Sequence, residues 1–256
     1  MKGSLEIITV CFNDLNNLKE TYRTLSQQSN LEFKWKVIDG ASVDGTLDFL
    51  KKIKPKFNFS FISEKDSGIY NAMNKGITQT SSEFLWFLNS GDTCFSDSVT
   101  EKIKKATIQS DAYLHLFPVK VDAGQSSFVT STKIGKRELL FNMPVCHQGI
   151  IYNKKVFTET GLFADQDFKI AADHDHLCRC YKTLKDQFQT HQEVIANYKG
   201  GGVSEANALK TLKELKKSNA KNFDQSWPTY CQPIYIKKLI SAARHDLLKA
   251  INVKAN

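Results

Sequence analysis

The sequence contains no run of about 18 apolar residues, the length that a membrane-spanning helix requires, so no transmembrane segment is predicted. The first residues, MKGSLEIITVCF, have one early lysine and then a β-branched pattern. They lack the apolar segment and the small-residue cleavage site of a secretory signal. Internal repeats and low-complexity tracts are also missing. We therefore expect a globular protein of the cytoplasm.

The cysteines form no CxxC pair, which removes the usual sequence sign of a zinc or dithiol site. Several of them lie in apolar runs, where a free cysteine behaves as a small hydrophobic residue. This usage fits a reduced, cytosolic compartment. The six are Cys11, Cys94, Cys146, Cys178, Cys180 and Cys231.

Two patterns that would indicate other functions are missing. A sugar nucleotidyltransferase normally has a Gly-rich loop with a basic residue after its first strand, and CFNDLNN has neither. A nucleic-acid-binding module is expected to have a basic stripe with exposed aromatic residues. Here most Phe and Trp residues fall inside strand patterns. Both functions are kept as alternatives, and no nucleic-acid partner is expected.

The 256 residues are 41% hydrophobic, which is enough for the core of one large α/β domain. The formal net charge of +8 favours an anionic partner, which includes nucleic acid, an anionic membrane surface and a phosphorylated substrate. Charge alone does not choose between these three.

Strand and helix patterns alternate over the first 90 or so residues, which predicts a parallel, doubly wound sheet. The first strand is nearly all apolar, as in a strand that is buried on both faces. Such sheets bind ligands beyond the carboxyl ends of their strands. Strands are expected at 5–12, 33–39, 57–63 and 83–89, and helices at 13–29, 46–53 and 69–80.

The second half of the chain is less regular. We expect one strand at 111–121, a helix at 171–184 and a flexible loop, KGGGVS, at 199–204. Residues 233–251 predict a basic amphipathic helix, which either packs on its own domain or lies on an anionic membrane. The predicted organisation is a domain over 1–204, with halves 1–110 and 111–204, and a helical tail over 205–256.

Polar residues follow the predicted strands where a ligand would bind. Asp39 follows the second strand, Asp66 the third, and FLNSGD ends at Asp92 after the fourth. Asp92 is the candidate metal ligand, because Mg²⁺ and Mn²⁺ prefer hard oxygens and often use one or two protein carboxylates. Asp39 and Asp44 bracket a Gly-containing loop. We expect Asp39 to contact ligand and Asp44 to cap the next helix.

Four motifs resemble one family when they are taken together: ITVCFNDLNNLKETYRTL, VIDGASVDGT, SEKDSGIYNAMNKGI and FLNSGD. They are similar to the family 2 glycosyltransferases of GT-A fold, in the bacterial exopolysaccharide, capsule and colanic-acid branch. The resemblance is close over 4–95 and looser to residue 204. It implies an α/β, Rossmann-like fold with a mainly parallel sheet flanked by helices, and a C-terminal helical tail.

The resemblance also implies a donor site for a nucleotide-diphosphate sugar, with UDP as the expected nucleotide and Mn²⁺ or Mg²⁺ as the cofactor. Asp92 matches the last carboxylate of the family's DxD metal motif, whose first position is Asn89 here. The implied donor-binding residues are Asn13, Asp39, Asp44, Asp66, Asn74, Lys75 and Asn89.

The family's catalytic base belongs to an acidic pair, which aligns with Ala172 and Asp173. Asp173 is therefore the implied base and Asp175 the alternative. The two point about 200° apart on a helix, so only one is expected to face the cleft. One carboxylate suffices for an inverting displacement, because it accepts the proton of the acceptor hydroxyl while a metal ion stabilises the departing diphosphate.

The remaining implied residues are His147, Gln148 and Arg179, near the acceptor or the diphosphate. A structural histidine and a solvated helix arginine are the alternatives for the first and the last. The implied activity is an inverting transfer to a lipid-linked or glycan acceptor in bacterial surface polysaccharide synthesis. The expected location is the cytoplasm, with peripheral attachment to the inner face of the cell membrane as an option.

Overall fold

The structure, a computed structural model, describes residues 3–122 and 126–223. Its main sheet has seven strands in the order β10-β6-β9-β4-β1-β2-β3. All neighbouring pairs are parallel except the two that involve β9, so the predicted, mainly parallel sheet is confirmed. The strands are β1 (Leu5–Cys11), β2 (Lys34–Asp39), β3 (Asn58–Ser63), β4 (Phe84–Phe87), β6 (Leu114–Leu116), β9 (Ile150–Asn153) and β10 (Phe188–Thr190).

Alternate residues of β4 enter two hydrophobic cores, one on each face of the sheet. Phe84 and Trp86 pack into one core and Leu85 and Phe87 into the other, and all four are fully buried. This is the period-two pattern of a strand that is covered on both sides. Helices α1 (Leu15–Ser26), α2 (Thr46–Lys52) and α4 (Val99–Ile108) cover the first face.

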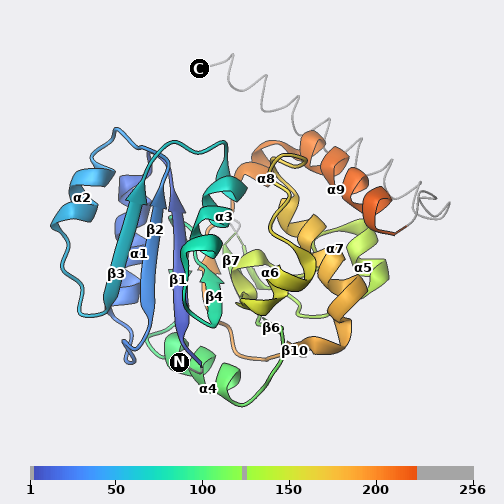
Figure 1. Cartoon of the computed structure of the whole chain (residues 1–256), viewed down its shortest axis with the longest axis horizontal. Helices are drawn as coiled ribbons and strands as arrows, with labels where there is room; N and C mark the ends of the chain where they lie inside the picture. The colour runs from blue at the N-terminus through green and yellow to red at the C-terminus, as the bar shows by residue number, and fades with distance from the viewer. Residues whose placement is uncertain (1–2, 123–125, 224–256) are drawn as a thin grey trace.

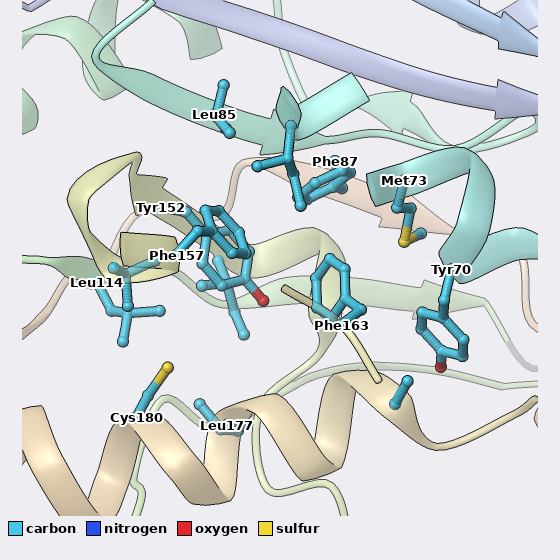
Figure 2. Close-up of a cluster of buried hydrophobic side chains, with 14 of the residues drawn as sticks. Tyr70, Met73, Leu85, Phe87, Leu114, Tyr152, Phe157, Phe163, Leu177 and Cys180 are labelled. Atoms are coloured by element: carbon cyan, nitrogen blue, oxygen red, sulfur yellow. The ribbon is translucent and has the colours of Figure 1, made fainter. Parts of the chain in front are cut away.

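The opposite face is covered by α3 (Ile69–Gln79), α5 (Lys136–Phe141), α6 (Lys155–Thr160) and α7 (Ala172–Leu184). Figure 2 shows the aromatic cluster of this core between β4, which carries Leu85 and Phe87, and the helix that carries Leu177 and Cys180. Tyr70 reaches into the same cluster from α3, with its hydroxyl directed toward α7. The core therefore ties the first half of the chain to the second.

The prediction of a single strand at 111–121 is wrong. The segment divides at Phe117 and Pro118 into β6 and β7 (Val119–Asp122), which belong to different sheets. Proline has no N–H to donate to a ladder, so it interrupts the strand at this point. The second sheet has the order β5-β11-β7-β8, with β5 (Thr93–Cys94), β8 (Ser127–Val129) and β11 (Ala196–Tyr198).

The C-terminal part of the described chain is helical, with α8 (Val203–Ala206) and α9 (Ala208–Asn222). In Figure 1, α9 runs beside α7 and α5, and it packs on both. The start of the predicted tail is thus part of the domain's packing, while the helix predicted at 233–251 lies outside the described residues. No described helix has the length and apolar character to cross a membrane. Short 3₁₀ turns are η1 (His147–Gly149) and η2 (Lys185–Gln187).

Candidate functional site

A cavity of about 640 Å³ opens beyond the carboxyl ends of β1 and β4. Its walls come from the loop after β1, the start of α3, the turn after β4 and the loop after β11. Parallel α/β sheets bind ligands at this edge, where helix starts and loop amides face the opening. The sequence-predicted residues Asn13, Asp66, Asn89, Asp92 and Gln148 line this cavity together.

One end of the cavity offers an aromatic ring beside polar groups. Phe12 directly follows β1, is 64% exposed and lines the cavity. A Cβ placed on Gly40 would lie 3.1 Å from the Phe12 ring and 2.9 Å from an oxygen of Asp66, so ring and carboxylate converge at this glycine. Asn13 ties the same loop to the next one, because its side-chain oxygen accepts a hydrogen bond from the amide of Val43 at 2.8 Å.

The other end of the cavity is built by the tight turn Asn-Ser-Gly-Asp after β4. Gly91 has φ +91°, a conformation that a residue with a side chain rarely adopts. Its amide donates to Thr21 Oγ1 at 3.0 Å, and that hydroxyl donates in turn to the carbonyl of Asp92 at 2.9 Å. Thr21 of helix α1 therefore holds the turn in place, and the side chains of the turn face the cavity.

Asp92 is the buried carboxylate of this turn, with 4% of its surface exposed. Its Oδ2 accepts hydrogen bonds from the amide of Asn89 at 3.1 Å and from the side chain of Gln148 at 3.0 Å. Burial raises the pKa of Asp92 to about 7, against the lowering effect of these two bonds. Because two hydrogen bonds do not offset the effect of burial, a bound cation would stabilise the ionised Asp92 carboxylate.

The turn has the oxygen ligands that a divalent metal ion needs. The Oδ1 atom of Asn89 is buried and has no hydrogen-bond partner among the described residues, in the same turn as the Asp92 carboxylate. Among the residues that the structure describes, no group of three His, Cys, Asp or Glu side chains could hold a metal. One carboxylate and one amide oxygen fit Mg²⁺ or Mn²⁺, which complete their shells with waters and phosphate oxygens.

Gln148 is held rigidly against Asp92. Its backbone carbonyl accepts a hydrogen bond from the Trp86 indole at 2.8 Å, and its side-chain oxygen accepts one from the Cys146 thiol at 2.9 Å. The next residue must be glycine, since a Cβ on Gly149 would lie 2.2 Å from the Phe117 carbonyl oxygen. His147 is buried beside the Phe87 ring and does not line the cavity. Its Nε2 atom has no hydrogen-bond partner among the described residues.

Asp173 is the half-buried carboxylate at the start of α7. Its Oδ1 accepts a hydrogen bond from the Tyr70 hydroxyl at 2.8 Å. Burial raises the pKa of the nearby Cys146 thiol to about 12, and the charges of Asp92 and Asp173 both add to that rise. Asp173 is not among the described residues that line the 640 Å³ cavity.

Asp175 differs from Asp173 in being completely buried. It forms an ion pair with Arg179 at 3.0 Å and accepts a hydrogen bond from Asn222 at 2.9 Å. Arg179 also donates to the carbonyls of Thr160, Gly161 and Leu162, so its guanidinium is engaged within the protein and lies outside the cavity-lining set.

The chain segment that precedes Asp173 is held by a residue of α9. One carboxylate oxygen of Glu214 accepts hydrogen bonds from the amides of Lys169, Ile170 and Ala171, at 3.0, 2.8 and 3.0 Å. Ala171 precedes α7 and has no side-chain acceptor, so Glu214 supplies the anion that a helix start favours.

Four implied donor residues make contacts within the protein and do not line the cavity. Asp39 is fully buried and accepts hydrogen bonds of 2.5 Å from the hydroxyls of Ser42 and Ser63. Asp44 accepts hydrogen bonds from the amides of Leu15 and Thr46. The side chain of Asn74 forms hydrogen bonds with the backbone N–H and C=O of Phe163. Lys75 forms an ion pair with Glu64, and none of the three lines the cavity. Asp44 accepts from the first amide of α2, but the N-cap of that helix is Gly45 and no side chain caps it, so the N-cap expected at Asp44 is wrong.

The cavity is also lined by Phe12, Tyr198 and Lys199, none of which is a sequence-predicted site residue. Lys199 is exposed and makes no ion pair with any described residue. It begins the loop of three glycines after β11. A lysine directly before a glycine run was the available signal, since such loops bring a backbone and a cation close to phosphate.

Comparison with known proteins decides the family. The profile described as Glycosyl transferase family 2 matches residues 6–161, which include the cavity's loops except the one after β11. This chain belongs to that family. An uncharacterized glycosyltransferase of Mycobacterium tuberculosis is 30% identical over 180 residues, which are 69% of this chain and 68% of the relative. A glycosyltransferase of PGL/p-HBAD biosynthesis from the same organism is 26% identical over 71% of each chain.

Solved structures show that this family member has the GT-A fold. The crystal structure of Staphylococcus aureus TarS, residues 1–349, superposes with a TM-score of 0.66 at 15% identity, covering 93% of this chain and 70% of that one. A mannosyltransferase from Pyrobaculum calidifontis, solved with GDP-Man and Mn²⁺, gives 0.63 at 15% identity, covering 97% and 75%. The fold expected from the sequence is confirmed.

Proposed function

We propose that this glycosyltransferase moves a sugar, with inversion, from a nucleotide-diphosphate donor to a hydroxyl of a lipid-linked or glycan acceptor. The observation that carries the proposal is the placement of Asp92 and Asn89 in one cavity with Lys199 and Phe12, with Asn89 Oδ1 unpartnered in the described part of the chain. The cavity thus offers an aromatic surface at one end and cation-binding oxygens with a lysine at the other. These two groups match the base and the diphosphate of a nucleotide.

The donor's nucleoside is assigned to the end with Phe12. The exposed ring offers a stacking surface for the base, and Asp66 and Asn13 offer acceptors for ribose or base N–H and O–H groups. UDP is the proposed nucleotide. Asp39, Asp44, Asn74 and Lys75 act on this end by fixing the loops and the helix that border it.

The diphosphate is assigned to the end with Asp92. Asp92 and Asn89 would hold Mn²⁺ or Mg²⁺, which supplies Lewis acidity to the departing diphosphate. Lys199, which also lines the cavity, adds a positive charge. Gln148 orients the Asp92 carboxylate through its 3.0 Å hydrogen bond.

Asp173 is assigned as the general base, and Asp175 stays in its ion pair. The acceptor oxygen attacks the anomeric carbon, the bond from that carbon to the diphosphate oxygen breaks, and the hydroxyl proton passes to the Asp173 carboxylate. Tyr70 holds this carboxylate in place. His147 supports the acceptor side of the site through its packing in the core. Arg179 supports the same side through its hydrogen bonds to the carbonyls of residues 160–162.

The proposed setting is the synthesis of a bacterial surface polysaccharide or glycolipid. A relative in Bacillus subtilis is named as a teichuronic acid biosynthesis glycosyltransferase, at 25% identity over 44% of this chain, and other relatives are named for PGL/p-HBAD biosynthesis. We propose a cytoplasmic enzyme that meets its acceptor at the inner face of the membrane. Family membership favours this activity over sugar nucleotidyl transfer or nucleic-acid binding.

Calorimetric titration with UDP, GDP and dTDP, each with and without Mn²⁺, tests the proposal. We expect one nucleotide, UDP, to bind only when the metal is present. The variant Asp92→Ala should lose most of this metal dependence, while the control Asp97→Ala, an exposed carboxylate elsewhere, should keep it. If no nucleotide binds in either condition, the proposed transfer is wrong.

A further inference from the structure

A second cavity, of about 370 Å³, lies beside α5 and is separate from the donor cavity. Its walls come from the segment before α5, from α5 itself and from the residues that follow it. Two cations, one carboxylate, one hydroxyl and two apolar side chains give it a mixed character. These are Lys133, Arg137, Glu138, Ser131, Phe141 and Met143.

The two cationic side chains of this cavity are available to bind an anion. Lys133 and Arg137 are exposed, and neither forms an ion pair with any described residue. Most exposed lysines simply face water, but these two converge on a concave surface that also presents the apolar groups Phe141 and Met143. An arginine and a lysine together favour a phosphate, which accepts several charge-assisted hydrogen bonds. Glu138 would repel a bare anion but would accept a hydrogen bond from a sugar hydroxyl.

The segments that line this cavity continue into contacts with Gln148 and with α7. Pro144, in its wall, is two residues before Cys146, so their Cα atoms are at most about 7 Å apart. The Cys146 thiol donates to the side chain of Gln148, which in turn donates to Asp92. On the other side, a ring nitrogen of His174, the neighbour of Asp173, donates to the carbonyl of Leu139 in α5 at 2.8 Å. Helix α5, which forms one wall of the cavity, is therefore in direct contact with the start of α7, where Asp173 lies.

We propose that this cavity binds the phosphate of a phosphorylated acceptor, a sugar phosphate or a lipid-linked sugar diphosphate, through Lys133 and Arg137. The inference rests on the proposed function, since it places the acceptor's sugar between Asp173 and the donor and its phosphate over α5. The Glu138 carboxylate accepts a hydrogen bond from a hydroxyl of that sugar. Phe141 and Met143 contact the apolar parts of the ligand. The enzyme thus selects acceptors that already carry a phosphate.

Phosphorus NMR of the whole protein, saturated with UDP and Mg²⁺ to block the donor cavity, tests the cavity directly. The probes are glucose 1-phosphate, N-acetylglucosamine 1-phosphate, inorganic phosphate and farnesyl-diphosphate-linked N-acetylglucosamine, with proton-observed binding of the free sugars as the neutral comparison. The double variant Lys133→Ala with Arg137→Ala is compared with Lys51→Ala with Lys52→Ala, which removes the same charge from the exposed end of α2.

We expect the sugar phosphates to bind, and the Lys133 and Arg137 double variant to bind them about tenfold or more weakly, because two charge-assisted contacts are lost. The Lys51 and Lys52 variant should match the wild type. Tighter binding of the farnesyl-linked probe than of the soluble phosphates identifies a lipid-linked acceptor, and the reverse identifies a soluble one. Equal binding by both double variants, or binding of inorganic phosphate alone, overturns the proposal.

The donor measurement separates this test from that of the proposed function. UDP affinity in the presence of metal should be the same in the wild type and both double variants. If UDP fails to bind at all, the proposed function fails first, and the acceptor assignment falls with it. If UDP binds normally and no sugar phosphate does, only the acceptor assignment is wrong.

Discussion

The hydroxyl of Tyr70 lies 2.8 Å from a carboxylate oxygen of Asp173, across 103 positions of the sequence. The same hydroxyl is 2.6 Å from the carbonyl of Ile170, in the segment that leads into α7. Tyr70 belongs to the helix that borders the donor cavity, and Asp173 begins the helix of the second half. One side chain therefore fixes the proposed base relative to the donor site, as Figure 2 shows for the reach of Tyr70 toward α7.

Replacing Asp173 by Asn should lower the transfer rate by about 10²–10⁴-fold, because the amide cannot accept the acceptor's proton. UDP affinity in the presence of metal should stay within about twofold, since the diphosphate is assigned to Asp92 at the other end of the site. Steady-state transfer and UDP titration of the same preparation measure both quantities.

Asp175→Asn is the matched control for this prediction. It should reduce the free energy of unfolding by about 2–4 kcal/mol, because it breaks a buried ion pair with Arg179, while the transfer rate changes little. Should Asp175→Asn abolish transfer and Asp173→Asn leave it intact, the base assignment has to move to Asp175.

Replacing Glu214 by Ala should lower kcat by about 10–100-fold with little change in donor KM, because the three amides before Asp173 lose their acceptor and the base shifts. Glu214→Gln keeps an acceptor oxygen and should recover most of the rate. Lys213→Ala, an exposed change on the same helix, is the control. A donor KM that rises as much as kcat falls would show that Glu214 serves general stability and does not position the base.

Replacing Phe12 by Ala should weaken UDP binding by about 1–3 kcal/mol, the usual contribution of a base that stacks on an aromatic side chain. Phe12→Tyr should bind nearly as well as the wild type. Phe95→Ala, an exposed phenylalanine outside the cavity, is the control, and both are measured calorimetrically with Mn²⁺ present. Equal affinity in Phe12→Ala and the wild type would place the base elsewhere.

Much of the first half could be predicted because its signals are local. Strand β4 is apolar throughout and β1 nearly so, and these patterns predict burial on both faces of the sheet. The parallel topology then gathers whatever follows the strands, which is why Asp66, Asn89 and Asp92 share one cavity as expected.

The rest depends on contacts between distant residues. Asp39 follows a strand as Asp92 does, but the hydroxyl of Ser63 on the neighbouring strand engages its carboxylate. Lys199 reaches the cavity only because β11 pairs with β5 and β7 in a second sheet, which no local pattern predicted. The prediction of a single strand at 111–121 missed the break at Pro118, and the pairing of its two parts in different sheets depends on distant strands.

The pH dependence of stability offers a test of Asp92 without substrate. Burial raises the pKa of this carboxyl from 3.8 to about 7, so between these values the folded protein holds a proton that the unfolded chain has released. Stability therefore falls as pH rises through this window, with a slope that approaches about 1.4 kcal/mol per pH unit, and levels off above pH 7. Asp92→Asn keeps the shape of the side chain and lacks this loss.

Urea unfolding in EDTA at several pH values from 4.5 to about 8 should thus show Asp92→Asn gaining stability relative to the wild type as pH rises, by up to the slope given by linkage. Asp97→Asn, an exposed carboxylate, controls for net charge and should show no such trend. Adding Mn²⁺ should reverse the order near pH 8, because the metal binds the ionised Asp92 and stabilises the folded wild type only. Parallel curves for the wild type and Asp92→Asn, with and without metal, would mean that Asp92 is neither strained by burial nor a metal ligand.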